Sequence, residues 1–325
     1  MSAYSLLRRP LFLFVCLLPA SLCLAGCGTQ AQNARKVQGS LIESLRHAQT
    51  DPTDKAAKQW ADQAIAVAPS DPDTYFGPRA PNPNDTVPTL SVSLVFGAAG
   101  DTPALAEYLT QAVKKFPNDE RGYLPLIEAQ KQLGQTAAQK ATAAKLVALL
   151  SAKLKTPGTT DIPSTTFSLG QAYFDAGDTV NGVATFTKAI QAYPADPTPL
   201  NILAYAYAVR GTNLPEALGL AQKAVAMAQK NKSDEGTLAA YLDTLGWVQY
   251  QQANYPAAEQ NLLQAANTLP RLAEIRYHLG LVYVAQGKMD AARSELKHAV
   301  QLAQGYAAAQ QALDTLPKTV AAKSP

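Results

Sequence analysis

Apolar and polar positions recur with a helical period along most of the chain. Over residues 163–304, large apolar residues and alanines stand three and four positions apart, the spacing that places side chains on one face of an α-helix. Long alternating runs of β-branched residues, which would predict strands, do not occur, and only residues 91–95 are ambiguous. The pattern therefore predicts an all-α chain.

The helical pattern itself repeats at a fixed interval. A Leu followed by Gly or Ala, then an aromatic in most copies, then Ala, a large apolar residue and Ala, recurs along residues 166–304. Leu169 and Leu203 are 34 residues apart, and so are Leu245 and Leu279. A period of this length is typical of a solenoid of stacked helix pairs, which presents a long surface to partners.

These repeats resemble the tetratricopeptide repeat (TPR). In that family, small residues at repeat positions 8, 20 and 27 let two helices approach closely, and larger residues at positions 7, 11 and 24 fill the space between them. Counted from Pro163, the first copy matches with Leu169, Gly170, Tyr173, Gly182, Phe186 and Ala189. The resemblance implies an all-α TPR solenoid with four clear units over residues 163–304, a capping helix over 305–317 and a tail over 318–325.

The N-terminal half follows the repeat less regularly. Residues 38–155 are predicted to form TPR-like helices that match the family poorly at several positions. Residues 77–88 contain four prolines, and residues 156–163 mix Pro, Gly and Thr, so both stretches have the composition of loops. The second stretch either divides the array into two sub-arrays or is only a long turn.

The chain begins with a predicted signal peptide over residues 1–26. Arg8 and Arg9 precede an apolar run over residues 11–24, which is too short to span a membrane comfortably. The run ends in Leu-Ala-Gly-Cys at residues 24–27, which resembles the lipobox of bacterial lipoproteins. That resemblance implies cleavage before Cys27 and lipidation of its thiol; the alternative is an ordinary secretory signal with a chance cysteine.

A lipid on Cys27 would anchor the protein in a bacterial cell envelope. Each methylene of acyl chains such as palmitate contributes about 0.8 kcal/mol when buried, and more than one chain gives a stable anchor. Gly28 follows the cysteine where an Asp would favour the inner membrane, so the resemblance implies an outer-membrane protein facing the periplasm. Residues 27–37 are predicted to be the lipidated cysteine and a flexible tether.

Charge, cysteine content and motifs exclude several function classes. Without its signal peptide the chain is nearly neutral, so we expect no nucleic-acid partner. One cysteine then remains, so no disulfide can form within the chain. Phosphate-binding loops, nucleophile elbows and zinc-protease motifs are absent from the sequence. We interpret His278 and His298 as packing or solvated residues, and predict no catalytic residue, no cofactor and no metal.

The TPR resemblance also implies a binding surface. In that family the concave face is lined by first-helix residues at positions 2, 5, 9, 12 and 13. Transferred to this sequence, those positions give a partner-binding groove that includes Phe167, Gln171, Phe174, Asn201, Tyr205, Asp243, Trp247, Tyr250, Tyr277 and Leu281. Tyr and Trp carry much of the energy of interfaces, although packing against neighbouring helices would also explain these rings. The basic clamp of chaperone-binding TPR proteins has no counterpart here.

Together these features predict a membrane-anchored scaffold. It would bind a partner protein or peptide through its aromatic groove, in the assembly of envelope or export machinery. The alternative is a glycan-associated protein whose aromatic residues contact an exopolysaccharide or peptidoglycan. A hydrolase within the irregular residues 78–163 is a third and weaker hypothesis.

Overall fold

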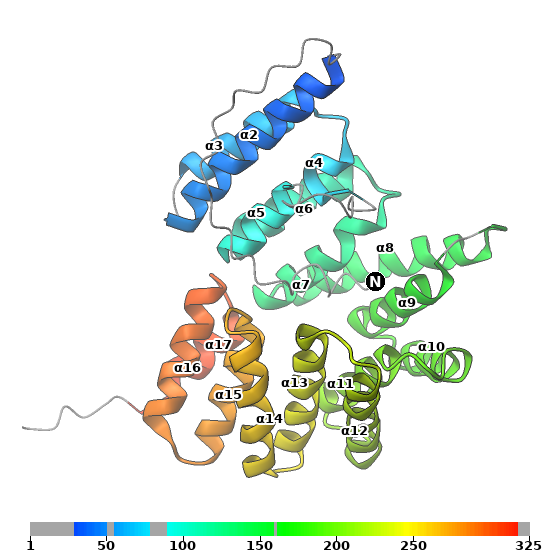
Figure 1. The fold of residues 1–325 in the computed structure, drawn as a ribbon, viewed down its shortest axis with the longest axis vertical. Helices are drawn as coiled ribbons and strands as arrows, with labels where there is room; N and C mark the ends of the chain where they lie inside the picture. Colours follow the sequence, from blue (N-terminus) through cyan, green and yellow to red (C-terminus); the bar gives the residue numbers. More distant parts are fainter. Residues whose placement is uncertain (1–28, 51–54, 79–89, 159–160, 318–325) are drawn as a thin grey trace, which may run out of the picture. The chain divides into compact units, whose positions relative to one another are not determined.

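The computed structural model describes residues 29–50, 55–78, 90–158 and 161–317, and within these ranges its regular secondary structure is helical, without strands (Figure 1). This confirms the predicted all-α fold. The predicted signal peptide, Cys27 and the tail over residues 318–325 lie outside the described residues. The chain divides into two compact units, Met1–Lys131 and Gln132–Pro325, and each is described by itself.

The first unit has its own apolar core. Its elements are α2 (Thr29–Thr50), α3 (Lys55–Val67), α4 (Pro72–Phe76), α5 (Val92–Ala99), α6 (Thr102–Lys115), the 3-10 helix η1 (Glu120–Gly122) and α7 (Tyr123–Gln132). Helix α2 packs against α3 and α5, and Leu41, Ala61 and Phe96 are buried between them. Of the ambiguous residues 91–95, the last four belong to α5, and Ser91 caps this helix by accepting a hydrogen bond from the Leu94 N–H.

The predicted flexible tether is wrong from Thr29 onward, because these residues are helical in α2. This helix begins at Thr29 and includes most of residues 27–37, which the composition had indicated as flexible. Ala34, Arg35 and Lys36 favour the helical state, and Val37 is already buried in the core of the first unit. The helix therefore starts close to Cys27 in the sequence.

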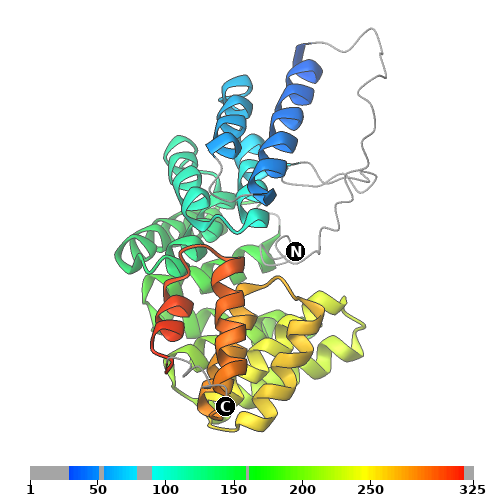
Figure 2. The same cartoon turned by 90° about the vertical axis from the view of Figure 1, so that its left-hand side faces the viewer.

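The second unit is a series of antiparallel helix pairs. Its helices are α8 (Thr136–Lys155), α9 (Ile162–Ala176), α10 (Thr179–Ala192), α11 (Thr198–Arg210), α12 (Leu214–Lys230), α13 (Glu235–Gln251), α14 (Tyr255–Thr268), α15 (Ala273–Ala285), α16 (Met289–Leu302) and α17 (Ala307–Asp314). Helix α8 packs against α9, so the Pro- and Gly-containing segment between them joins two packed helices within one unit. Helix α17 lies against α16 at the end of the series (Figure 2).

Three helix pairs close around a glycine of their first helix. A Cβ added at Gly170 would lie 2.6 Å from the ring of Phe186, and one at Gly246 would lie 2.7 Å from Leu262. Gly280 faces Leu296 in the same way, at 2.8 Å. These distances are shorter than van der Waals contact, so the large residue of the second helix fills the volume that the glycine leaves free. This is the packing that the repeat pattern predicts.

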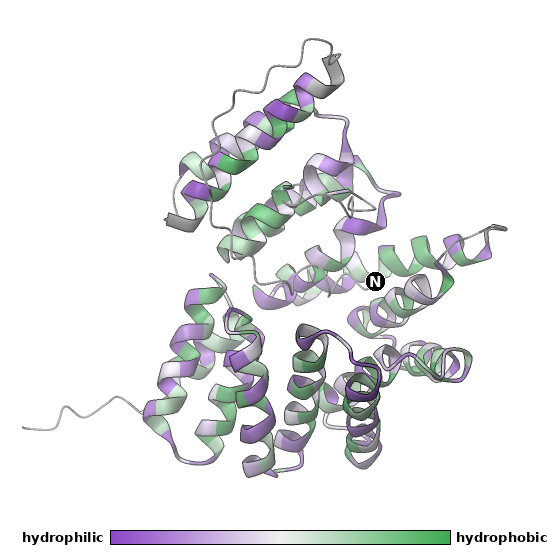
Figure 3. Cartoon of the chain, viewed as in Figure 1, coloured by the Kyte–Doolittle hydropathy of each residue, from purple (hydrophilic) through white to green (hydrophobic). Residues whose placement is uncertain are grey.

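Neighbouring repeats meet mainly through the second helix of one repeat and the first helix of the next. Helix α10 packs against α11, α12 against α13 and α14 against α15. The first helices α11 and α13 also pack against each other, and α13 makes a smaller contact with α15. Apolar residues gather on the faces where helices meet (Figure 3). We call the surface formed by α9, α11, α13 and α15 the first-helix face; all the residues of the predicted groove belong to these four helices.

Candidate partner-binding face

Four residues of the predicted groove lie inside the protein. Phe167, Phe174, Asp243 and Trp247 are between 5 and 8% exposed and belong to the buried layer below the first-helix face. Phe174 stacks on Phe186 with 5.7 Å between ring centroids, so its ring fills the first repeat. The prediction that these four side chains line an open aromatic groove is therefore wrong, because neighbouring helices cover them.

The other predicted residues are partly exposed on the first-helix face. They are Gln171, Asn201, Tyr205, Tyr250, Tyr277 and Leu281. Three tyrosines on three successive first helices thus remain accessible, each with an apolar ring and a hydroxyl group. Burial, with a smaller contribution from Tyr255, raises the pKa of Tyr250, so its phenol stays protonated at neutral pH and can donate a hydrogen bond.

A stack of rings connects the exposed tyrosine of α13 to the buried layer. The rings of Trp247 and Tyr250 are stacked with centroids 4.8 Å apart and an interplanar angle of 12°. His278, on α15, stacks on the same indole at 4.2 Å and 17°. Tyr250 therefore packs on Trp247, and Trp247 packs in turn on His278 of the next repeat.

A buried contact between a histidine and a carboxylate in this layer was not predicted from the sequence. The Nδ1 atom of His278 lies 2.9 Å from Oδ1 of Asp243, and both side chains are almost entirely buried. The two residues are 35 positions apart, close to the repeat length, which brings them together on adjacent first helices. That near-coincidence with the period was the one signal in the sequence that could have predicted the contact.

Polar contacts also join the accessible residues to their neighbours. The Tyr205 hydroxyl donates a 2.5 Å hydrogen bond to Glu274, which links α11 to α15. The Gln171 amide donates to Asp175 at 3.0 Å within α9. The indole N–H of Trp247 and the side-chain oxygen of Asn201 are buried, and neither atom has a hydrogen-bond partner among the described residues. A water or ligand that reached these atoms would supply the missing hydrogen bonds.

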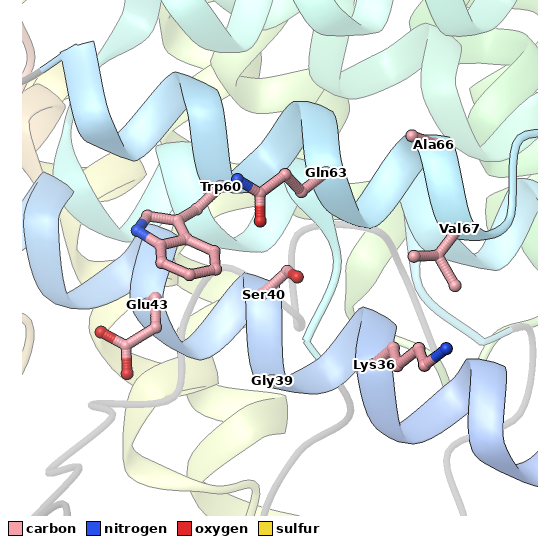
Figure 4. A pocket seen from close by; sticks show the side chains of 8 residues that line it. All are labelled: Lys36, Gly39, Ser40, Glu43, Trp60, Gln63, Ala66 and Val67. Atoms are coloured by element: carbon pink, nitrogen blue, oxygen red, sulfur yellow. The ribbon is translucent and has the colours of Figure 1, made fainter.

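A hollow lies in the first unit. It is an open groove between α2 and α3, lined by Lys36, Gly39, Ser40, Glu43, Trp60, Gln63, Ala66 and Val67 (Figure 4). Trp60 and Glu43 flank one end, and Lys36 and Val67 lie toward the other. Its lining is mainly apolar and comes from the surfaces of two helices. No site was predicted here from the sequence.

The described residues offer neither a metal cluster nor a membrane-spanning helix. Among them, no group of three or more His, Cys, Asp or Glu side chains is placed to hold a metal ion. In the same part of the chain, no helix combines the length and the apolar character that a membrane crossing requires.

The fold and the repeated glycine packing define this protein as a helical-repeat protein. Residues 167–232 and 244–307 match the model of the tetratricopeptide repeat family, so the second unit contains tetratricopeptide repeats. These segments overlap the range 163–304 in which the sequence predicts four units, and the second extends three residues beyond it. TPR repeats form scaffolds for protein interaction and bind protein or peptide partners.

Several solved structures are similar to this chain at low sequence identity. The structure of yeast Tom70 matches with a TM-score of 0.51 and 17% identity over 86% of this chain and 54% of that one. A tetratricopeptide repeat protein from Parabacteroides merdae matches with 0.49 and 13%, over 86% and 98% of the two chains. The Cut9–Hcn1 hetero-tetramer matches with 0.44 and 14%, over 87% and 52%.

The match to Tom70 supports the fold and carries no conclusion about activity. The chain spans about half the length of the matched Cut9–Hcn1 and Tom70 chains. A search of curated proteins finds no match.

Proposed function

We propose that the protein is a membrane-anchored scaffold that binds a partner protein or peptide on its first-helix face. The observation that carries this proposal is the row of partly exposed tyrosines, Tyr205, Tyr250 and Tyr277, one on each of three successive first helices. Tyrosines supply large contact area at a low cost in conformational entropy, and they are frequent among residues that dominate binding energy.

The layer beneath this row favours binding to a preformed surface. Tyr250 rests on Trp247, and the Tyr205 hydroxyl is held by Glu274, so both side chains are oriented before a partner arrives. Binding to side chains that are already ordered costs less conformational entropy than binding that must first order them. Residues repeated along successive helices suit an extended peptide or a single helix, both of which present side chains at regular intervals.

The protein is proposed to act at a bacterial cell envelope, in the assembly of envelope or export machinery. The lipobox-like residues at Cys27 support an anchor in the membrane, with the repeats in the periplasm on the inner side of the outer membrane. The absence of catalytic motifs from the sequence supports a role in which the protein holds other molecules together.

The anchor can be tested by following the lipid itself. In a bacterial host that processes lipoproteins, the full chain should become labelled by a clickable palmitate analogue, and Cys27→Ser should lose the label completely because serine offers no thiol. Cys23→Ser is the matched control, since it removes a cysteine of the same segment that follows Leu22, and it should remain labelled. Labelling of Cys27→Ser would contradict the proposed anchor.

A glycan partner is the second candidate function. Exposed tyrosine rings at regular intervals can stack on the apolar faces of sugars, and this feature of the first-helix face favours a glycan as the second candidate. Co-sedimentation of the purified protein with insoluble cell-wall or capsular polysaccharide separates the two candidates. The scaffold proposal expects the protein to stay in the supernatant; sedimentation that Tyr250→Ala abolishes would favour the glycan.

A further inference from the structure

The side chains of Asp243 and His278 form a buried polar contact between two repeats. It joins two repeats, because Asp243 belongs to α13 and His278 to α15. The His278 ring also stacks on Trp247, whose other ring contact, Tyr250, reaches the first-helix face. A titratable side chain is therefore coupled through one indole to an accessible tyrosine.

The titratable groups around His278 come from three helices. Asp243 makes the direct contact, and the tilted rings of Tyr205 on α11 and Tyr277 on α15 lie 6.4 and 5.8 Å away, centroid to centroid. Glu274 also lies on α15 and accepts the hydrogen bond from Tyr205.

Carboxylates on the two helices that flank α15 pair with cations of their own. Glu259 of α14 pairs with Lys288, and Glu295 of α16 pairs with Arg276. Asp243 is in direct contact with the His278 ring.

Protonation would change the forces on this ring. Histidine is the side chain that ordinarily changes charge between about pH 5 and 8. A proton gained by His278 places a positive charge between the Asp243 carboxylate and the face of the Trp247 indole. Both attract a cation, through a charge-assisted hydrogen bond and through the ring quadrupole. The neutral ring keeps the hydrogen bond and loses the two charge-dependent attractions.

We propose that His278 is a proton-sensitive positioning residue, which holds Trp247 more tightly when protonated and thereby sets the orientation of Tyr250. This effect of His278 on Trp247 and Tyr250 is expected in the free protein and needs no partner. Its consequence for binding, that partner affinity varies with pH, rests on the function proposed above.

The composition of the chain provides a direct test. The protein has two tryptophans and three histidines, so Trp60→Phe leaves Trp247 as the sole indole reporter. Its emission should follow a single-proton titration between about pH 5 and 8 and fall at acid pH, because a contacting imidazolium quenches indole. Adding His278→Gln should abolish the titration. Adding His47→Gln and His298→Gln instead should leave it unchanged.

A second readout covers the case in which His278→Gln fails to fold. In the variant that lacks His47 and His298, the one remaining imidazole proton resonance should titrate with the same midpoint as the Trp247 emission. Emission that is flat between about pH 5 and 8, a titration that survives His278→Gln, or two different midpoints would overturn the proposal. None of these measurements needs a partner, so their failure is separate from a failure of the scaffold function.

Discussion

Replacing Phe186 by Ala is expected to lower the free energy of unfolding by about 3–5 kcal/mol, the usual cost of deleting a buried aromatic ring. Phe186 is completely buried, stacks on Phe174 and occupies the space that Gly170 leaves open. Neither neighbour can fill the resulting cavity, because glycine has no side chain and the Phe174 ring is held by its own packing. The effect follows from the central packing rule of the repeat.

Urea unfolding of the full chain, followed by helical circular dichroism, measures this cost. The matched control is Val180→Ala on the same helix, where the side chain is 80% exposed and the change should stay within about 0.5 kcal/mol. Equal unfolding midpoints for the two variants would show that Phe186 does not close the first repeat.

Replacing Tyr250 and Tyr277 by Ala is expected to abolish most binding of the partner. Truncation of a residue that dominates an interface costs about 2 kcal/mol or more, or roughly 30-fold in affinity for each. Both side chains are partly exposed on the first-helix face, and their rings rest on buried neighbours, Trp247 and Tyr306 respectively. Loss of either ring therefore removes a preformed contact.

The affinity of the two variants for the isolated partner should be compared with that of Leu263→Ala. Leu263 lies on the second helix α14 and is 38% exposed, so its removal takes away apolar surface outside the proposed site. Unchanged affinity in the tyrosine variants, with normal helical content, would contradict the assignment of these residues. Trp247→Ala is unsuitable for this purpose, because the buried indole contributes to folding and its removal would confuse the two effects.

The fold was predictable because its determinants are local and periodic. Gly170, Gly246 and Gly280 recur where two helices approach, and the large residue that each one accommodates stands 16 positions later. In a chain with these spacings, a glycine of one helix faces a large residue of the next, so the sequence predicts stacked helix pairs. The capping position of Ser91 also shows why the ambiguous segment after it is helical.

The exposure of individual groove residues was less predictable. Position within the repeat places Trp247 and Tyr250 on the same helix face, but the bulk of the neighbouring repeat decides how much of each remains accessible. His278 covers the indole of Trp247, and this contact depends on a residue 31 positions away. Composition misled in a different way at residues 29–37, where polar residues with good helix propensity were interpreted as a tether.

Site-specific photo-crosslinking in cells tests the central claim most directly. A photoreactive phenylalanine analogue is placed at Tyr250 or Tyr277 on the first-helix face, and at Leu263 or Val180 on second helices as matched controls. We expect one discrete protein adduct from the first two positions and none from the controls. Adducts of equal yield from both faces, or adducts from the controls alone, would contradict a partner-binding first-helix face.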